Sequence, residues 1–205
     1  MSRPQVKICG ITRREDAAAA VAAGADAIGL VFFEGSRRAV TPEAARRIVD
    51  AVGPLTTVVG LFVNASAEAV HAVCDQVALN VLQFHGDESA AFCEQFARPY
   101  IKALPVGEGH DVAAGVASHP RARAVLLDTA STGQFGGSGE TFDWGLIPKG
   151  LPKPLIVAGG LDPDNVAAAV RQLNPAAVDV SSGVENKPGI KDEALMVAFV
   201  RAAKA

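Results

Sequence analysis

The chain has 205 residues, 49% of them hydrophobic and 20% charged, with 19 basic and 22 acidic side chains and a net charge of −3. This length suits a single domain, residues 1–205, with a well-filled core. Nucleic-acid binders concentrate Lys and Arg on one face, so scattered arginine pairs in a slightly acidic chain exclude a nucleic-acid partner. Three cysteines without metal-ligand spacing favour a reducing, cytoplasmic location, with no metal and no disulfide framework.

Short apolar runs recur along the chain at intervals of roughly 20 to 30 residues. They are Val6–Ile8, Ala27–Val31, Val58–Phe62, Val81–Phe84, Tyr100–Leu104, Ala124–Leu127, Leu155–Ala158 and Ala177–Val180. Nearly continuous apolar runs are typical of strands that are buried on both faces of a parallel sheet. The one longer apolar stretch, 17–33, is divided by Gly24-Ala25-Asp26 into pieces too short to span a bilayer, so no membrane partner is expected.

Helix signals stand between most of these runs, as alternating strand and helix units require. They are Thr12 before a helix at 13–23 with Gly24 after it, Thr41 before Pro42, Ser66, the ranges 111–118 and 142–147, Asp162 before Pro163, and Asp192. Eight such units predict either a closed (β/α)8 barrel or an open doubly wound sheet.

The glycine turns favour the barrel. The first turn, Cys9-Gly10-Ile11-Thr12, lacks the Gly-x-Gly-x-x-Gly fingerprint of a dinucleotide-binding sheet. Gly159-Gly160 follows the seventh run and Ser182-Gly183 follows the eighth. These are the two loops that commonly form a phosphate site in a (β/α)8 barrel. We therefore predict a TIM barrel with lean loops and a phosphate site after strands 7 and 8.

Polar residues at the strand ends are the candidates for chemistry, because barrel active sites lie at the carboxyl ends of the strands. Cys9 ends the first run, and its position alone fits a buried hydrophobe as well as a reactive thiol. Asp128 ends the sixth run and is either a turn cap or a general acid. Gln83 and His85 end the fourth run as pocket residues, and His85 is equally well explained as a structural histidine.

Strand periodicity places Lys7 on the same side as Cys9, and Asp179 lies two residues before Ser181 in the eighth run. Since closure makes the first and eighth strands neighbours, we predict that Lys7 and Asp179 form a buried ion pair beneath the site. The planar guanidinium of Arg38 would suit a second anion, such as a carboxylate, although the pattern alone favours a surface arginine.

Taken together, these motifs resemble phosphoribosylanthranilate isomerase, the (β/α)8 enzyme family of tryptophan biosynthesis. The resemblance runs through Lys7-Ile8-Cys9-Gly10, Leu61-Phe62-Val63-Asn64, Gln83-Phe84-His85-Gly86, Leu127-Asp128-Thr129, Gly136-Gly137-Ser138-Gly139, Gly159-Gly160-Leu161, Asp179-Val180-Ser181-Ser182-Gly183-Val184-Glu185 and Pro188-Gly189. Eight motifs in the same order, from Lys7 to Asp192, make it specific.

The resemblance implies a cofactor-free Amadori rearrangement of a phosphorylated aminoaldose, N-(5′-phosphoribosyl)anthranilate, to 1-(2-carboxyphenylamino)-1-deoxyribulose 5-phosphate. By resemblance, Cys9 is the general base, Asp128 the general acid and Arg38 the ligand of the anthranilate carboxylate. Arg37 stands where the family often has proline, so either arginine is open for that role. The phosphate ligands implied are Gly137, Ser138, Gly139, Gly159, Gly160, Ser182 and Gly183.

Two alternatives remain at this stage. A histidine-pathway aminoaldose isomerase is disfavoured because that chemistry typically uses two aspartates, and Cys9 stands in the first place. A non-catalytic phosphosugar-binding barrel would tolerate the loss of Cys9 or Asp128, but both are present. The oligomeric state expected is a monomer or a homodimer.

Overall fold

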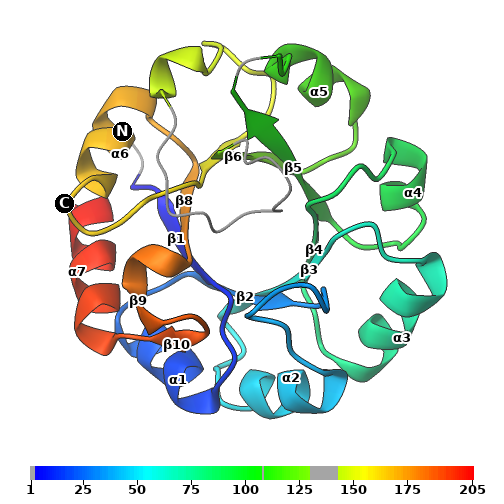
Figure 1. Ribbon diagram of the computed structural model, residues 1–205, viewed down its shortest axis with the longest axis vertical. Coiled ribbons are helices and arrows are strands. Elements are labelled where there is room, and N and C mark those ends of the chain that lie inside the picture. The colour runs from blue at the N-terminus through cyan, green and yellow to red at the C-terminus, as the bar shows by residue number, and fades with distance from the viewer. Residues whose placement is uncertain (1–2, 108, 130–142) are drawn as a thin grey trace.

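The computed structural model describes residues 3–107, 109–129 and 143–205. Its main sheet is a closed barrel of eight parallel strands, in which each strand pairs with the next and the eighth pairs with the first (Figure 1). The strands are β1 (Gln5–Cys9), β2 (Ala27–Val31), β3 (Thr57–Phe62), β4 (Val81–Phe84), β5 (Tyr100–Val106), β6 (Ala124–Thr129), β7 (Leu155–Val157) and β8 (Ala177–Val180). The predicted TIM barrel is confirmed, and each predicted run corresponds to one strand.

Helices form a ring around the barrel (Figure 1). They are α1 (Arg14–Ala22), α2 (Pro42–Val49), α3 (Ala67–Gln76), α4 (Ala90–Glu94), α5 (Val112–Ser118), α6 (Val166–Leu173) and α7 (Glu193–Ala203). Short 3-10 turns follow at η1 (Trp144–Leu146) and η2 (Ser182–Val184), and β9 (Glu185–Lys187) pairs with β10 (Ile190–Lys191) in a small hairpin after β8.

Burial on both faces of the strands explains the continuous apolar runs. In β6, Val125 and Leu127 pack with Val112 of α5, whereas Leu126 belongs to a second apolar cluster. Successive side chains of a strand alternate between faces, so Asp128 shares the face of Leu126. The same alternation therefore fills the core and brings a polar residue to the end of the strand on the inner side.

Several helix caps agree with the sequence. Thr41, Ser66, Asp111 and Asp192 each accept a hydrogen bond from a backbone N–H in the first turn of the helix that follows. Such caps satisfy donors that the first helical turn leaves unpaired. The helix α4, capped by Ser89, was not predicted.

Three expectations about helix starts are wrong. Thr12 does not cap α1, because its hydroxyl donates to the carbonyl of Gly189 and the N-cap position falls to Arg13. Asp162 does not open α6, since its carboxylate accepts from the backbone N–H groups of Asp164 and Asn165 in a preceding turn. The helix expected at 142–147 is only the 3-10 turn η1, and residue 142 lies outside the described residues.

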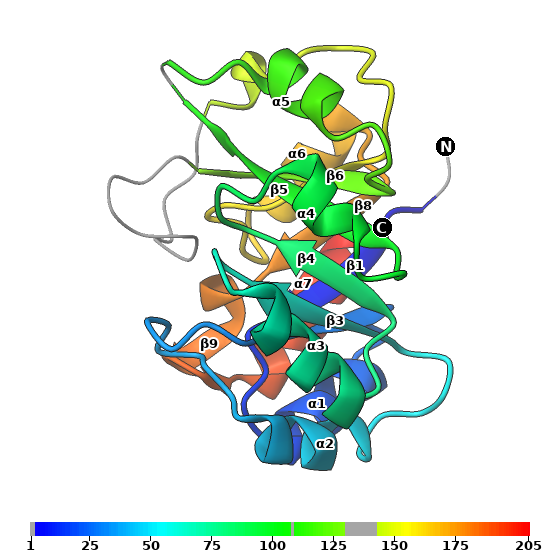
Figure 2. The same ribbon diagram turned by 90° about the vertical axis from the view of Figure 1, so that its right-hand side faces the viewer.

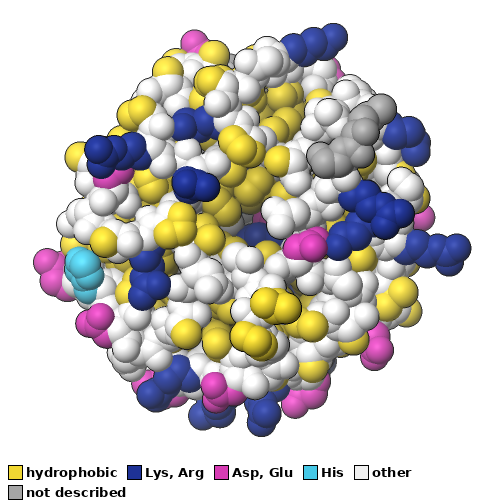
Figure 3. Space-filling model, turned by 180° about the vertical axis from the view of Figure 1, so that it is seen from behind, with side chains coloured by type: hydrophobic (Ala, Val, Ile, Leu, Met, Phe, Trp, Pro, Cys, Tyr) yellow, Lys and Arg dark blue, Asp and Glu magenta, His cyan; other side chains and the backbone are white. Residues whose placement is uncertain are grey.

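The two ends of the barrel differ. In the side view, the β9 hairpin lies at one end and the N mark at the other (Figure 2). The amino-terminal end is hollowed by a cavity of about 490 Å³ whose lining includes Val59, Val81, Ile101 and Ile156 (Figure 3).

No helix in the described part of the chain is both long enough and apolar enough to cross a membrane.

Candidate active site

A pocket opens at the carboxyl-terminal ends of the barrel strands, and a buried ion pair lies beneath it. Lys7 of β1 and Asp179 of β8 are register partners across the strand pair that closes the barrel. The Nζ atom of Lys7 lies 2.9 Å from Oδ1 of Asp179, and the two side chains are 5% and 8% exposed. The predicted ion pair is confirmed. Burial works against the charge of Lys7, but Asp179 outweighs it and raises the pKa of Lys7, so this cation persists.

Cys9 ends β1 and lines the pocket above this pair. It is 6% exposed and packs in an apolar cluster with Val31, Leu61 and Val63. Burial raises the pKa of the Cys9 thiol, and the positive charge of Lys7 opposes that rise. The thiol is thus a buried group with a fixed cation beside it that faces the pocket, whereas Cys93 is buried in the main apolar core.

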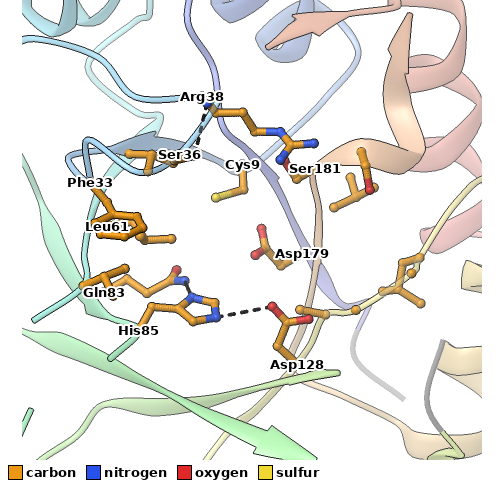
Figure 4. A pocket seen from close by; sticks show the side chains of 18 residues that line it. Cys9, Phe33, Ser36, Arg38, Leu61, Gln83, His85, Asp128, Asp179 and Ser181 are labelled. Atoms are coloured by element: carbon orange, nitrogen blue, oxygen red, sulfur yellow. Dashed lines mark hydrogen bonds and ion pairs between the residues drawn. The ribbon is translucent and has the colours of Figure 1, made fainter. Parts of the chain in front are cut away.

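Asp128 ends β6 and lines the same pocket. Its Oδ1 accepts a hydrogen bond of 2.8 Å from the backbone N–H of Thr129, so the turn-cap interpretation holds. Its Oδ2 lies 3.3 Å from Nε2 of His85. Figure 4 shows Cys9 and Asp128 on opposite sides of the pocket with Asp179 between them. One carboxylate therefore serves a local turn and also faces the cavity.

His85 is held between two side chains. Its Nδ1 atom lies 3.1 Å from Nε2 of Gln83, and its Nε2 atom faces Asp128 (Figure 4). The Gln83 amide nitrogen can donate to Nδ1, which leaves Nε2 as the ring atom that faces Oδ2 of Asp128. Gln83 is fully buried, and its Oε1 has no hydrogen-bond partner among the described residues. The chain Gln83–His85–Asp128 fixes the direction of the carboxylate.

The two candidate arginines, Arg37 and Arg38, differ in how far their side chains are exposed to solvent. Arg37 is exposed, whereas Arg38 is 9% exposed and lines the pocket. The Arg38 guanidinium donates from Nε and Nη2 to the two carboxylate oxygens of Glu185, at 2.9 and 2.8 Å. These hydrogen bonds raise the pKa of Arg38, which stays charged. The sequence does not predict the role of Glu185, because nothing in its neighbourhood points to Arg38, which is 147 residues away.

The glycine turns after β7 and β8 meet at the pocket. Gly159 and Gly160, with φ of +78° and +61°, line it together with Ser182. Gly183 lies behind them, where an added Cβ would be 2.0 Å from the carbonyl oxygen of Leu161. Positive φ and this close approach both require glycine. The remaining predicted phosphate ligands, Gly137, Ser138 and Gly139, lie outside the described residues.

The predicted residues of the described part thus converge on one pocket, apart from Lys7 and Gly183, which lie just behind its lining. No group of three or more His, Cys, Asp or Glu side chains within residues 3–107, 109–129 and 143–205 is arranged to hold a metal. A closed barrel with a thiol, a carboxylate, an arginine and two glycine turns at its carboxyl-terminal end defines the class of (β/α)8 enzymes with a polar pocket at that end.

Comparison with known proteins identifies the family. Residues 6–202 match the family model of N-(5′-phosphoribosyl)anthranilate (PRA) isomerase. An N-(5′-phosphoribosyl)anthranilate isomerase of Pseudomonas fluorescens is 60% identical over 198 residues, covering 97% of this chain and 94% of its own. The chain belongs to this isomerase family.

Solved structures agree with that membership. The phosphoribosyl anthranilate isomerase of Thermotoga maritima superposes with a TM-score of 0.90 at 40% identity, over 98% of both chains. A second structure, of the enzyme in complex with reduced 1-(o-carboxyphenylamino)-1-deoxyribulose 5-phosphate, gives a TM-score of 0.85 at 40% identity over 98% of both chains.

Proposed function

We propose that this isomerase converts N-(5′-phosphoribosyl)anthranilate to 1-(2-carboxyphenylamino)-1-deoxyribulose 5-phosphate in tryptophan biosynthesis, with Cys9 as general base and Asp128 as general acid. The observation that carries the proposal is the placement of Cys9 and Asp128, at the ends of β1 and β6, on opposite sides of one pocket (Figure 4). The reaction requires a proton donor and a proton acceptor that reach different atoms of one sugar, and this arrangement supplies both.

The proton transfers follow from that placement. Asp128 donates a proton to the furanose ring oxygen, the bond from this oxygen to C1′ breaks, and a protonated imine forms at C1′. The Cys9 thiolate then takes the proton from C2′, and the electron pair of that C–H bond neutralises the iminium nitrogen. The resulting enol becomes the 2′-ketone by moving a proton to C1′. Substrate and product are isomers, and the proton that Cys9 gains and the proton that Asp128 loses are exchanged with solvent before the next turnover, so the proposal includes no cofactor.

Binding is assigned to groups around these two residues. Backbone of the turns at Gly159-Gly160 and Ser182-Gly183 would hold the 5′-phosphate, because turns of this kind let N–H groups approach an anion closely. The predicted ligands Gly137, Ser138 and Gly139 belong to the same proposal. The Arg38 guanidinium would hold the anthranilate carboxylate through a charge-assisted fork. Lys7 favours the thiolate form of Cys9, since its charge opposes the effect of burial.

A histidine-pathway aminoaldose is the second candidate substrate. The position of Arg38 favours the anthranilate substrate over it. Arg38 is a cation at the pocket wall, well placed for a benzoate carboxylate. We further propose that the enzyme is cytoplasmic and acts as a monomer or a homodimer; sedimentation of the purified protein tests the second point.

The test of the proposal is turnover by the purified protein. N-(5′-phosphoribosyl)anthranilate, generated in the cuvette, should lose its anthranilate fluorescence, and a ¹³C label at C2′ should move to the ketone region of the NMR spectrum. A protein that leaves this substrate unchanged, or that isomerises only the histidine-pathway aminoaldose, would show the proposal to be wrong.

A further inference from the structure

The Arg38 side chain is one part of a buried charge cluster that also contains Glu185 and Lys191. Glu185 opens β9 and Lys191 ends β10, so the hairpin after β8 supplies both residues, whereas Arg38 comes from the loop after β2. In the Arg38–Glu185 ion pair, the side chains are 11% and 4% exposed. The hairpin therefore reaches across the end of β1 to hold an arginine of the pocket wall.

Glu185 is itself firmly anchored. Its Oε1 lies 2.7 Å from Nζ of Lys191, a side chain that is 0% exposed. The backbone N–H of Gly189 adds a hydrogen bond of 3.3 Å to the same oxygen. Burial alone would raise the pKa of Glu185, but the hydrogen bonds from Arg38 and the charge of Lys191 lower it, so the carboxylate is ionised. If Glu185 released its partners, a fully buried ammonium would lose its counter-ion, which is strongly unfavourable.

The aliphatic stem of Arg38 is also fixed. A Cβ added to Gly10 would lie 2.5 Å from Cδ of Arg38, which shows how closely the stem packs on the turn after β1. The backbone N–H of Arg38 donates to Oγ of Ser36 at 3.1 Å, and Figure 4 shows the guanidinium beside Ser181. Because the stem and the Nε edge are both held, the guanidinium plane has a defined orientation.

A guanidinium has five N–H donors in a planar fork. Glu185 takes one donor from Nε and one from Nη2. The donors left over include one on Nη1 and one on Nη2 that point the same way, which is a second edge able to bind a carboxylate through two hydrogen bonds. Arg38 stays charged, so this second edge carries a positive charge, which suits a carboxylate.

We propose that Glu185 is a positioning residue for substrate recognition: it fixes Arg38 so that the Nη1–Nη2 edge alone is presented to the carboxylate of the substrate's aryl ring. This inference rests on the proposed function for the identity of that carboxylate. Glu185 does not touch the substrate, and its effect is therefore confined to ligands that carry the carboxylate. A purely structural role would instead weaken every ligand of the pocket equally.

Binding and turnover are measured separately so that the two proposals can fail independently. The probe for binding is reduced 1-(o-carboxyphenylamino)-1-deoxyribulose 5-phosphate, paired with its phenylamino counterpart, which lacks the carboxylate. Titration calorimetry gives Kd for both ligands in the wild type, in Glu185→Gln and in Glu193→Gln. Glu193 is an exposed residue of α7, so its variant controls for the change in net charge. Turnover by the wild type tests the proposed function alone.

For Glu185→Gln we expect Kd to rise by at least about tenfold for the carboxylate ligand and by less than about twofold for the phenylamino ligand. Glu193→Gln should match the wild type with both. In turnover, KM should rise while kcat changes little. In an Arg38→Met background, Glu185→Gln should have no further effect, because the group that it positions is gone.

Loss of folding is addressed by a second variant. Glu185→Leu combined with Lys191→Met removes the anchor and its cation together and leaves Arg38 as the one charge of the cluster, so this variant should lose less stability than Glu185→Gln and show the same selective loss of the carboxylate ligand. Equal weakening of both ligands, or an unchanged Kd for the carboxylate ligand in either variant, would overturn the inference.

Discussion

Replacing Lys7 by Met removes one partner of the ion pair beneath the pocket. The carboxylate of Asp179 then stays buried at 8% exposure without the ammonium that lies 2.9 Å away in the wild type. Leaving one member of such a pair unpaired costs about 3–5 kcal/mol. In a domain of this size, roughly 2–4 °C of Tm is lost per kcal/mol, so Lys7→Met should lower Tm by roughly 6–20 °C.

Urea denaturation at pH 7, followed by circular dichroism, measures this loss. Lys187→Met, at an exposed position of β9, is the matched control and should leave the free energy of unfolding within about 0.5 kcal/mol of the wild type. The double variant Lys7→Met, Asp179→Leu removes both charges and should regain most of the stability. A loss below about 1 kcal/mol for Lys7→Met, or a double variant as unstable as the single one, would refute this reasoning.

Three further predictions follow from single groups. Burial raises the pKa of Cys9 above its ordinary value of 9.0, so the rate at which iodoacetamide alkylates Cys9, followed by peptide mass spectrometry, should still increase with pH between 7 and 9 because the thiolate fraction grows; an alkylation rate that is already constant above pH 7 would contradict this. Gly183→Ala would place a Cβ 2.0 Å from the carbonyl oxygen of Leu161, so the glycine turns must separate and Kd for inorganic phosphate, measured by calorimetry, should rise by about tenfold or more, with an unchanged Kd as the opposing result. The buried hydroxyl of Tyr100 has no hydrogen-bond partner among the described residues, so Tyr100→Phe should stabilise the fold by about 1 kcal/mol in urea denaturation. Burial also raises the pKa of Tyr100 from 10.0 to about 12. Unfolded tyrosine therefore ionises first as pH rises, the wild type should lose stability between pH 10 and 12, and Tyr100→Phe should lack that part of the loss.

Much of the barrel was predictable because its strands are buried on both faces. Runs such as Ala27–Val31 and Ala177–Val180 have the bounds of the strands themselves. Period-two alternation together with closure also predicted the Lys7–Asp179 contact, although the two residues are 172 positions apart. Patterns that depend on the strand period and on topology could be read from the sequence.

Helix starts were less predictable because local cap signals compete with distant partners. The Thr12 hydroxyl bonds to Gly189, which is 177 residues away, and no local pattern reveals this. The resemblance favoured Arg38 but left Arg37 open for the same role, and only the fold exposes Arg37 and buries Arg38. Glu185 could not be recognised for the same reason, since its function depends on the meeting of the loops after β2 and β8.

The most direct test of the central claim is the turnover of Cys9→Ser and Asp128→Asn compared with the wild type. The assay follows anthranilate fluorescence with N-(5′-phosphoribosyl)anthranilate, and calorimetry with the reduced product analogue confirms that each variant still binds. The account predicts that both variants lose at least about a hundredfold in kcat while Kd changes by only a few-fold. Either variant turning over at close to the wild-type rate would contradict the assignment of Cys9 as base or Asp128 as acid.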